Sequence, residues 1–199
     1  VEEQIQSAME SFCDTYAQKA EAVIQRDRDV NAMEVSIDET VTHILARRQP
    51  AAVDLRMLVA IIKVITDLER IGDEAEKVAR MSLELQRRDF VAEIPRGIIH
   101  LAAIVSDMLK KSLDAFARLD SKSAEAAAFL DGDADKEFRE ILRSQMTRMM
   151  EDPKRIGASL DMIWAAKALE RIGDHSKNIC EYVIYLVEGK DVRHLADTE

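Results

Sequence analysis

The chain has 199 residues, of which 47% are hydrophobic and 33% charged, and its formal net charge is −10. The length permits one domain of moderate size or two small ones, and three prolines with six glycines leave little room for the turns of an all-β fold. The negative charge argues against nucleic acid as a ligand. It suits a soluble protein that attracts cations or basic partner surfaces. No apolar run of about 18 residues is visible, so no transmembrane helix is expected, and no signal peptide is visible either.

Apolar residues recur at helical spacing along nearly the whole chain. They predict helices over residues 2–26, 30–48 and 52–88 in the first half, with a charged break at 26–29, and over 96–118, 121–151 and 156–187 in the second half. The helix over 121–151 is expected to be interrupted near Gly132, and Gly189 is a natural residue to end the last one. The sequence therefore predicts an all-α fold of two tandem antiparallel three-helix bundles, residues 1–92 and 93–199.

The two cysteines, Cys13 and Cys180, lie far apart in separate helical patterns and form no Cys-x-x-Cys pair. We interpret both as small buried residues of a protein from a reducing compartment. This interpretation gives them a packing role.

One six-residue motif occurs twice. The sequence Leu-Glu-Arg-Ile-Gly-Asp occupies residues 68–73 and returns unchanged at 169–174, in the longest predicted helix of each half. The apolar stretches before the two copies differ, as core positions of similar size tolerate. The identical polar residues therefore ask for a separate reason, and the repeat predicts a duplicated helical unit.

Acidic residues share one face around each motif, away from the buried stripe. The third predicted helix carries Glu69, Asp73 and Glu76, the last carries Glu170, Asp174, Asn178 and Glu181, and the second adds Asn31, Glu34 and Asp38. Carboxylates at positions i and i+4 lie one helical turn apart, close enough to bind a hard cation. In the second half Asp131, Asp133 and Asp135 come near the matching position, while Phe138 and Leu142 stand where Glu34 and Asp38 would be repeated, so the two halves need not bind metal equally.

A solvated charged face is the alternative interpretation. Arg70 and Arg171 are then expected to neutralise Asp73 and Asp174 through i,i+3 contacts. The glycine in each copy argues for a specific role, because a glycine inside a helix costs about 1 kcal/mol relative to alanine. It allows the close approach of another backbone or of a ligand. His175, beside Asp174, is either a further ligand or an ordinary solvated histidine.

Enzymatic activity has little support in the sequence. A di-iron carboxylate enzyme needs Glu-x-x-His pairs inside a bundle, and no histidine of this chain has a glutamate three residues before it. Neither a Gly-x-Ser-x-Gly nucleophile motif nor a glycine-rich phosphate loop is present. No catalytic residue is predicted. A metal-free adaptor that docks its acidic faces on basic partner surfaces remains an alternative.

The doubled motif, the Asp54-Leu55-Arg56 sequence after Pro50 and the stretch 169–181 resemble the PhoU phosphate-signalling family, over nearly the whole chain. The resemblance implies a cytoplasmic regulator that restrains the phosphate-starvation response and modulates phosphate uptake, and not an enzyme. It implies two partners, the ATPase subunit of the phosphate ABC transporter and a membrane sensor histidine kinase. It further implies a homodimer that reaches the membrane only through these partners.

The same resemblance implies metal binding. Some family members bind multinuclear iron or other metals through Glu/Asp-x-x-x-Asp pairs, which here correspond to Glu69 with Asp73 and Glu170 with Asp174. The Glu34–Asp38 pair has the same form. We expect iron, zinc, manganese or magnesium and no organic cofactor, with Glu76, Asn178 and Glu181 completing the ligand set.

Overall fold

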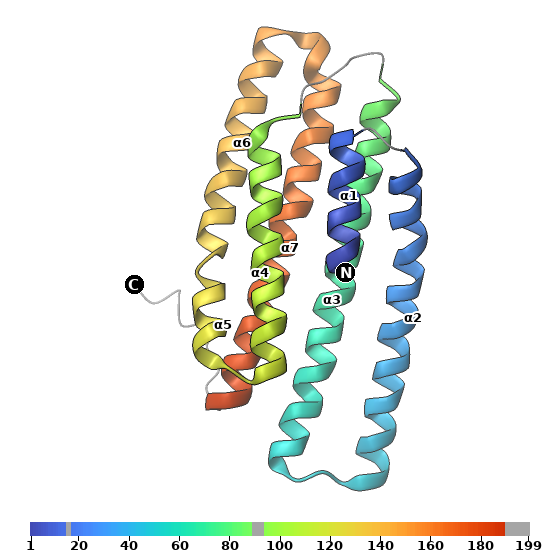
Figure 1. The fold of residues 1–199 in the computed structure, drawn as a ribbon, viewed down its shortest axis with the longest axis vertical. Helices are drawn as coiled ribbons and strands as arrows, with labels where there is room; N and C mark the ends of the chain where they lie inside the picture. Colours follow the sequence, from blue (N-terminus) through green and yellow to red (C-terminus); the bar gives the residue numbers. More distant parts are fainter. Residues whose placement is uncertain (15–16, 89–93, 190–199) are drawn as a thin grey trace.

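The structure is a computed structural model that describes residues 1–14, 17–88 and 94–189. These ranges contain no strand, and the predicted all-α fold of two three-helix bundles is confirmed (Figure 1). The helices are α1 (Glu2–Asp14), α2 (Ala17–Arg48), α3 (Ala52–Gln86), α4 (Arg96–Arg118), α5 (Ser121–Ala128), α6 (Asp131–Glu151), the 3-10 turn η1 (Pro153–Arg155) and α7 (Ile156–Glu188). The predicted boundary between residues 92 and 93 lies outside the described ranges.

The first bundle departs from the predicted elements at the charged stretch 26–29. We expected a break there, but α2 runs through it without interruption from Ala17 to Arg48. Neither proline nor glycine stands in this stretch, and charged side chains alone do not end a helix. α1 is correspondingly shorter than predicted and ends at Asp14.

The second bundle follows the predicted pattern more closely. The helix expected over 121–151 is divided into α5 and α6 by a turn at 129–130, close to Gly132. Gly189 ends α7 with a φ of 73°, a left-handed conformation that suits glycine, and its N–H donates to the Tyr185 carbonyl.

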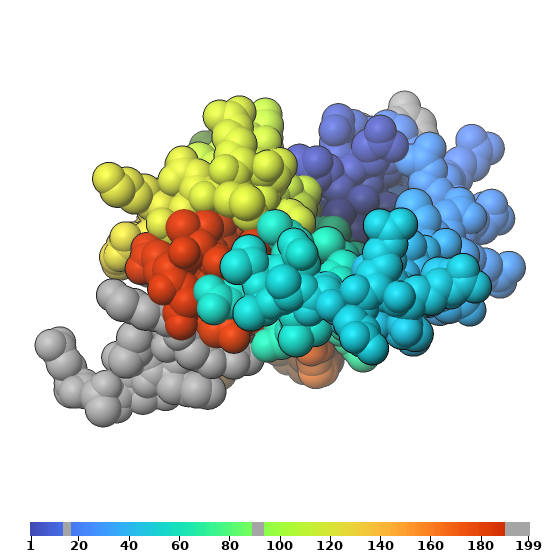
Figure 2. All heavy atoms as spheres, turned by 90° about the horizontal axis from the view of Figure 1, so that it is seen from below, coloured from blue at the N-terminus to red at the C-terminus, as the bar shows by residue number. Residues whose placement is uncertain are grey.

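The two bundles are joined through α3 and α7, which run antiparallel side by side (Figures 1 and 2). The Arg88 guanidinium meets the Asp161 carboxylate near one end of this pair, with Nε 2.5 Å from Oδ2, and Arg56 lies over the Tyr185 ring at the other. Both halves contribute to one hydrophobic core, which contains Ile71 of α3, Leu101 of α4 and Ile172 of α7. The duplicated unit therefore forms one body, with two bundles sharing an interior.

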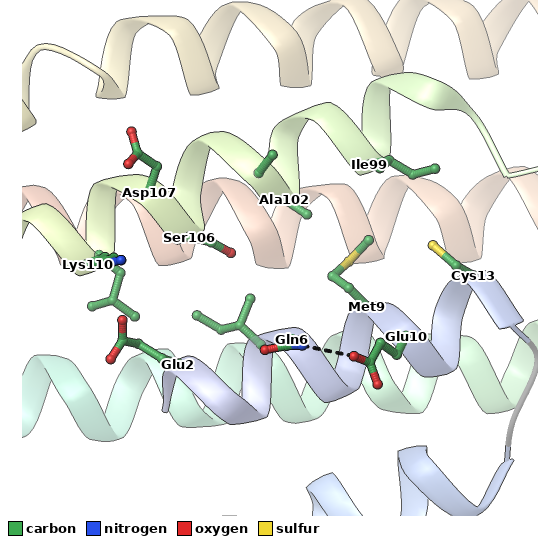
Figure 3. Close-up of a pocket in the computed structure, with 13 residues that line it drawn as sticks. Glu2, Gln6, Met9, Glu10, Cys13, Ile99, Ala102, Ser106, Asp107 and Lys110 are labelled. Carbon is green, nitrogen blue, oxygen red and sulfur yellow. Dashed lines mark hydrogen bonds between the residues drawn. The ribbon is translucent and has the colours of Figure 1, made fainter.

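α1 of the first bundle and α4 of the second bundle are also in contact. A groove of about 550 Å³ lies between them, lined by apolar side chains including Ile5, Met9 and Ile99 (Figure 3). Cys13 is exposed, so the expectation of a buried cysteine is wrong there, because its side chain lines this open groove and not the core. Cys180 is buried as expected, and burial raises the pKa of its thiol to about 12. Among the described helices, none has an apolar stretch long enough to cross a bilayer.

Candidate functional site

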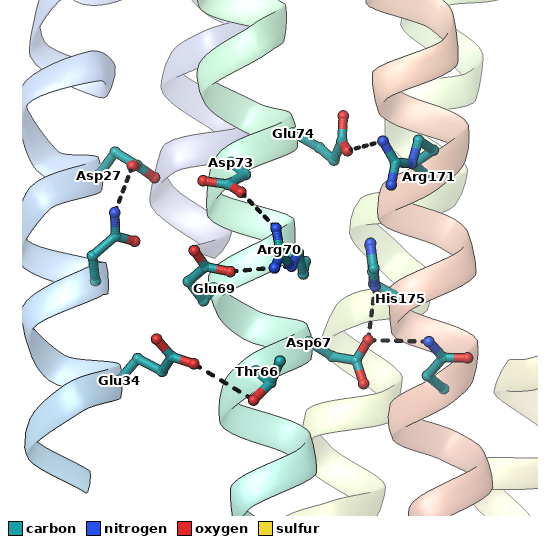
Figure 4. A network of polar contacts seen from close by, with 12 residues as sticks. Asp27, Glu34, Thr66, Asp67, Glu69, Arg70, Asp73, Glu74, Arg171 and His175 are labelled. Carbon is teal, nitrogen blue, oxygen red and sulfur yellow. Dashed lines mark hydrogen bonds and ion pairs between the residues drawn. The ribbon is translucent and has the colours of Figure 1, made fainter. Parts of the chain in front are cut away.

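α2 and α3 together form a first acidic cluster, which we define as Asp27, Glu34, Glu69, Asp73 and Glu76. Figure 4 shows the first four of these residues. The sequence placed the α3 members on a face away from the core. The structure corrects this, since Glu69, Asp73 and Glu76 are half-buried along the side of α3 that meets α2. The helical pattern of α3 identifies its most buried stripe, but it gives no information on which neighbour covers the adjacent side.

Asp27 is the member that sequence reasoning missed. It lies inside α2 and is only 7% exposed, and its Oδ2 accepts a hydrogen bond from Asn31 Nδ2 at 3.2 Å. A Cβ added to Gly72 would lie 3.1 Å from Asp27 Oδ1. Gly72 thus permits the close approach that its position in the motif suggested, here by a carboxylate of the neighbouring helix.

Crowding of like charges marks this cluster. Burial raises the pKa of Asp27 above its usual range, and the nearby Glu76 and Asp73 carboxylates raise it further. Burial also raises the pKa of Glu69, followed by the charge of Asp73, while Arg70 opposes the shift. The crowded carboxylates hold their negative charge at a free-energy cost that a cation would offset.

Basic side chains compensate only part of this charge. The Arg70 guanidinium lies 3.5 Å from Glu69 and 3.4 Å from Asp73, the latter being the predicted i,i+3 contact. Arg80 Nη2 donates to Glu76 at 2.6 Å. Asp27 has no cation among these contacts.

The predicted Glu34–Asp38 pair lies at the edge of the first cluster. Glu34 accepts a hydrogen bond of 3.5 Å from the Thr66 hydroxyl of α3, and its charge acts on Glu69. Asp38 lies one turn further along α2 and is exposed. Of this pair, the structure brings only Glu34 into electrostatic reach of the motif residues.

α6 and α7 form a second acidic cluster, defined as Asp131, Asp135, Glu170 and Asp174. Two of its carboxylates form ion pairs with lysines: Lys177 Nζ lies 2.7 Å from Asp131, and Lys167 Nζ lies 2.5 Å from Glu170. Asp174 is exposed by surface area, yet desolvation by the surrounding protein raises the pKa of its carboxyl to about 6, with Glu170, Asp131 and Asp135 contributing in the same direction.

The acidic residues that face the α7 motif are Asp131 and Asp135, two of the three aspartates near the expected position. Phe138 and Leu142 do follow Glu34 and Asp38 by 104 residues. The acidic pair of α6, Asp131 and Asp135, lies about two helical turns before them. Asp131 and Asp135 follow Asp27 and Asn31 by the same 104 residues. This spacing can be read from the sequence, but it relates the two aspartates structurally only when residues 26–29 are helical, as they are in α2.

Three other residues near the α7 motif bond toward α3. Asp67 Oδ1 lies 2.7 Å from His175 Nδ1 and accepts a hydrogen bond of 3.0 Å from Asn178 Nδ2 (Figure 4). His175 is thus neither an ordinary solvated histidine nor directed at Asp174. Arg171 also departs from expectation, since it pairs with Glu74 at 2.7 Å and not with Asp174.

The remaining predicted ligand, Glu181, lies one turn beyond Asn178 on α7 and is half-buried. Its charge raises the pKa of Lys177, after the hydrogen bond from that lysine to Asp131. Glu181 therefore belongs to the ionic surroundings of the second cluster, and Asn178 contributes its amide to the α3–α7 contact.

The donor chemistry of the first cluster fits a hard cation. Its carboxylate oxygens are hard donors, and among the described residues Asp27 Oδ1 and the neighbouring amide oxygen, Asn31 Oδ1, are buried with no hydrogen-bond partner. Within the described ranges, however, no three carboxylate, imidazole or thiolate groups already converge as a ligand set. A cation would require Glu69 or Asp73 to rotate from Arg70 toward the unpartnered oxygens.

The fold and these clusters define a class: an internally duplicated, all-α protein of two fused bundles with a carboxylate cluster on each. The PhoU domain matches residues 1–82 and 98–183, which is one copy in each half. The chain belongs to the PhoU family.

Named relatives share this match over the entire chain. The phosphate-specific transport system accessory protein PhoU homolog of Pseudomonas aeruginosa is 47% identical, covering 100% of this chain and 82% of the relative. The PhoU accessory protein of Escherichia coli K12 is 40% identical, with the same coverages.

Solved structures show the same architecture. The crystal structure of PhoU from Pseudomonas aeruginosa superposes with a TM-score of 0.90 at 46% identity, covering 95% of this chain and 90% of that one. The phosphate transport system regulatory protein PhoU from Streptococcus pneumoniae gives a TM-score of 0.88 at 27% identity, covering 96% and 89%.

Proposed function

We propose that this protein is a cytoplasmic accessory protein of phosphate transport that restrains the phosphate-starvation response and modulates phosphate uptake. The observation that carries the proposal is 47% identity over the whole chain to a protein named for this transport system, together with the intact doubled motif. The role requires no catalytic residue, and the regulatory name of the Streptococcus pneumoniae relative supports it.

The proposed mechanism is bridging. When phosphate is plentiful, the protein contacts the ATPase subunit of the phosphate ABC transporter and a membrane sensor histidine kinase, and holds the kinase in its phosphatase-favouring state. It reaches the membrane only through these partners, and we expect it to act as a homodimer. A rigid body of two bundles sharing one core suits this role, because it offers separate faces in fixed relation.

The regulatory part is tested by deleting the gene and measuring a phosphate-starvation promoter in phosphate-rich medium. Deletion should leave the promoter fully active, and the wild-type gene supplied in trans should restore repression. Low promoter activity in the deletion strain would overturn the proposal.

The acidic clusters are proposed to bind iron, zinc, manganese or magnesium, the first cluster more tightly than the second. A bound cation would supply positive charge that offsets the crowding of Asp27, Glu69 and Asp73. The second cluster is the weaker site, because ammonium groups already occupy Asp131 and Glu170.

Metal content is measured by ICP-MS on protein purified without an affinity tag. Glu69→Ala/Asp73→Ala should remove most of the metal, and Glu170→Ala/Asp174→Ala should remove less. Circular dichroism establishes that both variants are folded. Equal metal in all three proteins would place the metal elsewhere.

A metal-free adaptor is the second candidate, in which the acidic clusters dock basic surfaces of partners. The basic side chains that already pair with Asp73, Glu76, Asp131 and Glu170 favour it, since they show that the carboxylates recruit cationic groups. Wild-type protein that is folded, active in repression and free of stoichiometric metal would establish this candidate.

A further inference from the structure

The antiparallel pair of α3 and α7 has two ends that the internal repeat makes comparable. Residues 101 apart occupy matching positions, so that Lys63 corresponds to Trp164 and Met81 to Tyr182. One end is closed: the hydrogen bonds of Asp67 tie the helices together, and the Lys63 ammonium lies 5.2 Å from the centroid of the Tyr182 ring. This end supplies an internal reference for the other.

The other end is open. A groove of about 430 Å³ runs between the helices, and its lining includes Glu74, Lys77 and Met81 from α3 and Trp164, Lys167 and Arg171 from α7. Trp164 is 62% exposed, although a tryptophan usually buries most of its surface. At the closed end the position that matches Trp164 holds Lys63, packed on the Tyr182 ring, whereas this end presents the Trp164 indole to solvent.

The groove is cationic within an acidic protein. Glu74 is 2% exposed, and one of its oxygens, Oε1, serves both Lys77 at 2.9 Å and Arg171 at 2.7 Å. One buried carboxylate thus faces two cations. Lys167 is a third cation, and it is paired with Glu170 at 2.5 Å and lies 5.4 Å from the centroid of the Phe138 ring, so three cations meet two carboxylates here. The chain as a whole carries a net charge of −10, so this local excess of positive charge favours an acidic ligand.

An exposed apolar row on α7 continues from the groove. Ile156, Leu160 and Trp164 follow one another at intervals of four residues, and all three are exposed. They share one helical face and extend over about 12 Å. Single exposed apolar residues are ordinary, but a row that leads into an aromatic and cationic groove is typical of an interaction surface.

We propose that this surface docks an amphipathic helix of a partner protein. The apolar side chains of that helix lie along Ile156, Leu160 and Trp164, and its acidic side chains, one or two turns further, face Lys77, Lys167 and Arg171. A groove between two helices fits a third helix, with spacings of three and four residues matching the row. Charge complementarity selects an acidic helix over a neutral or basic one.

The surface goes beyond the regulatory role proposed above, and it is tested without the transporter or the kinase. The probe is a synthetic helical peptide of about 18 residues, with leucines along the first half of one face and glutamates along the second half. A second peptide has lysine in place of each of these glutamates. If the peptide does not bind, the result of the gene-deletion experiment is unaffected. If the deletion experiment fails, the peptide-binding result still stands.

Trp164 is the only tryptophan of the chain, so its emission reports occupancy of the groove directly. The glutamate peptide should shift this emission to shorter wavelength, with a matching rise in fluorescence anisotropy when the peptide is labelled. The lysine peptide should produce neither change. Added salt should weaken binding, because the charged contacts lie at the surface.

Variants distinguish the groove from unspecific binding. Lys77→Gln/Lys167→Gln should weaken the glutamate peptide about fivefold, the loss expected for two partly exposed charge contacts. Leu160→Ser should weaken it by a similar factor. Lys63→Gln is the matched control, since it removes one positive charge from the closed end of the same helix pair and should leave binding unchanged.

Three outcomes would overturn the proposal. The first is equal binding of the two peptides, or binding without a change in Trp164 emission. The second is an emission maximum of the free protein that shifts with protein concentration, which would assign the groove to a second copy of this chain. The third is displacement of the peptide by millimolar ATP with a change in emission, which would make the groove a nucleotide site.

Discussion

The two halves of this protein share a motif and differ in the charges that surround it. In α3 the motif is followed by Glu76 and Arg80, and in α7 the corresponding positions hold Lys177 and Glu181, so the order of charges is reversed. Glu76 adds a negative charge beside Asp27, whereas Lys177 neutralises Asp131. The same backbone therefore supports one crowded acidic cluster and one that is largely compensated.

This difference shows which properties the duplication kept. The core positions and the helix order match in both halves, because both must fill one shared interior. Partly exposed positions face no such packing requirement, so their charges are free to diverge. Matched substitutions 101 residues apart test this separation.

The largest effect is expected for the shared core. Ile71→Ala and Ile172→Ala each remove a fully buried side chain from the same cluster and should lower the free energy of unfolding by about 3 kcal/mol. Because the core is continuous, each variant should show a single unfolding transition in urea, followed by circular dichroism. Ile99→Ala, at an exposed site, serves as the control. Two separate transitions would mean that the bundles unfold independently.

The paired arginines of the motif come next. Arg171→Ala leaves the buried Glu74 carboxylate with Lys77 as its remaining partner and should cost about 2 kcal/mol. Arg70→Ala removes an exposed guanidinium that lies 3.4 and 3.5 Å from its carboxylate partners, and it should cost less than about 0.5 kcal/mol. Urea unfolding of both variants at low salt measures the difference, and equal costs would contradict it.

The motif glycines should respond in opposite directions. Alanine at Gly173 meets nothing closer than 3.5 Å, so Gly173→Ala should stabilise the protein by about 0.5–1 kcal/mol through helix propensity. Alanine at Gly72 would press on Asp27 Oδ1 at 3.1 Å, and Gly72→Ala should be neutral or destabilising. The melting temperatures of the two variants and of the wild type, measured with EDTA present, test whether the two substitutions change stability in opposite directions. A stabilising Gly72→Ala would show that α2 yields easily.

The smallest effect concerns the pH dependence of the second cluster. The pKa of Asp174 is raised from 3.8 to about 6, so the folded protein binds this proton more tightly than the unfolded chain. Its ionisation therefore lowers stability as pH rises from about 4 through 6. Asp174 is exposed, and solvent screening limits the effect to about 1 kcal/mol or less.

Asp174→Asn should flatten this part of the pH profile and make the protein more stable than wild type at pH 7. Urea unfolding of both proteins between pH 4 and 7 with EDTA present measures the change. A wild-type stability that rises with pH over this interval, in parallel with the variant, would contradict the raised pKa.

The sequence by itself determined the helical fold, the two bundles and the position of the motif. Apolar periodicity is a local property, and a hexapeptide returning after 101 residues is visible without any structure. The i,i+4 carboxylates at 69 and 73 and at 170 and 174 were identified for the same reason. The break at 26–29 was predicted wrongly because local charge was taken as a helix boundary.

Only the tertiary structure decided which charges meet. Asp27 joins Asp73 because α2 packs against α3 at Gly72, and Arg171 turns to Glu74 because α7 lies against α3. These partners are separated by about 50 to 100 residues in the sequence, and exposed charges influence one another only when the fold brings them within about 10 Å. The exposure of Trp164 is likewise set by how the helices pack around it and not by its own position in the sequence pattern. Such contacts follow from helix packing, which the periodicity of one helix does not contain.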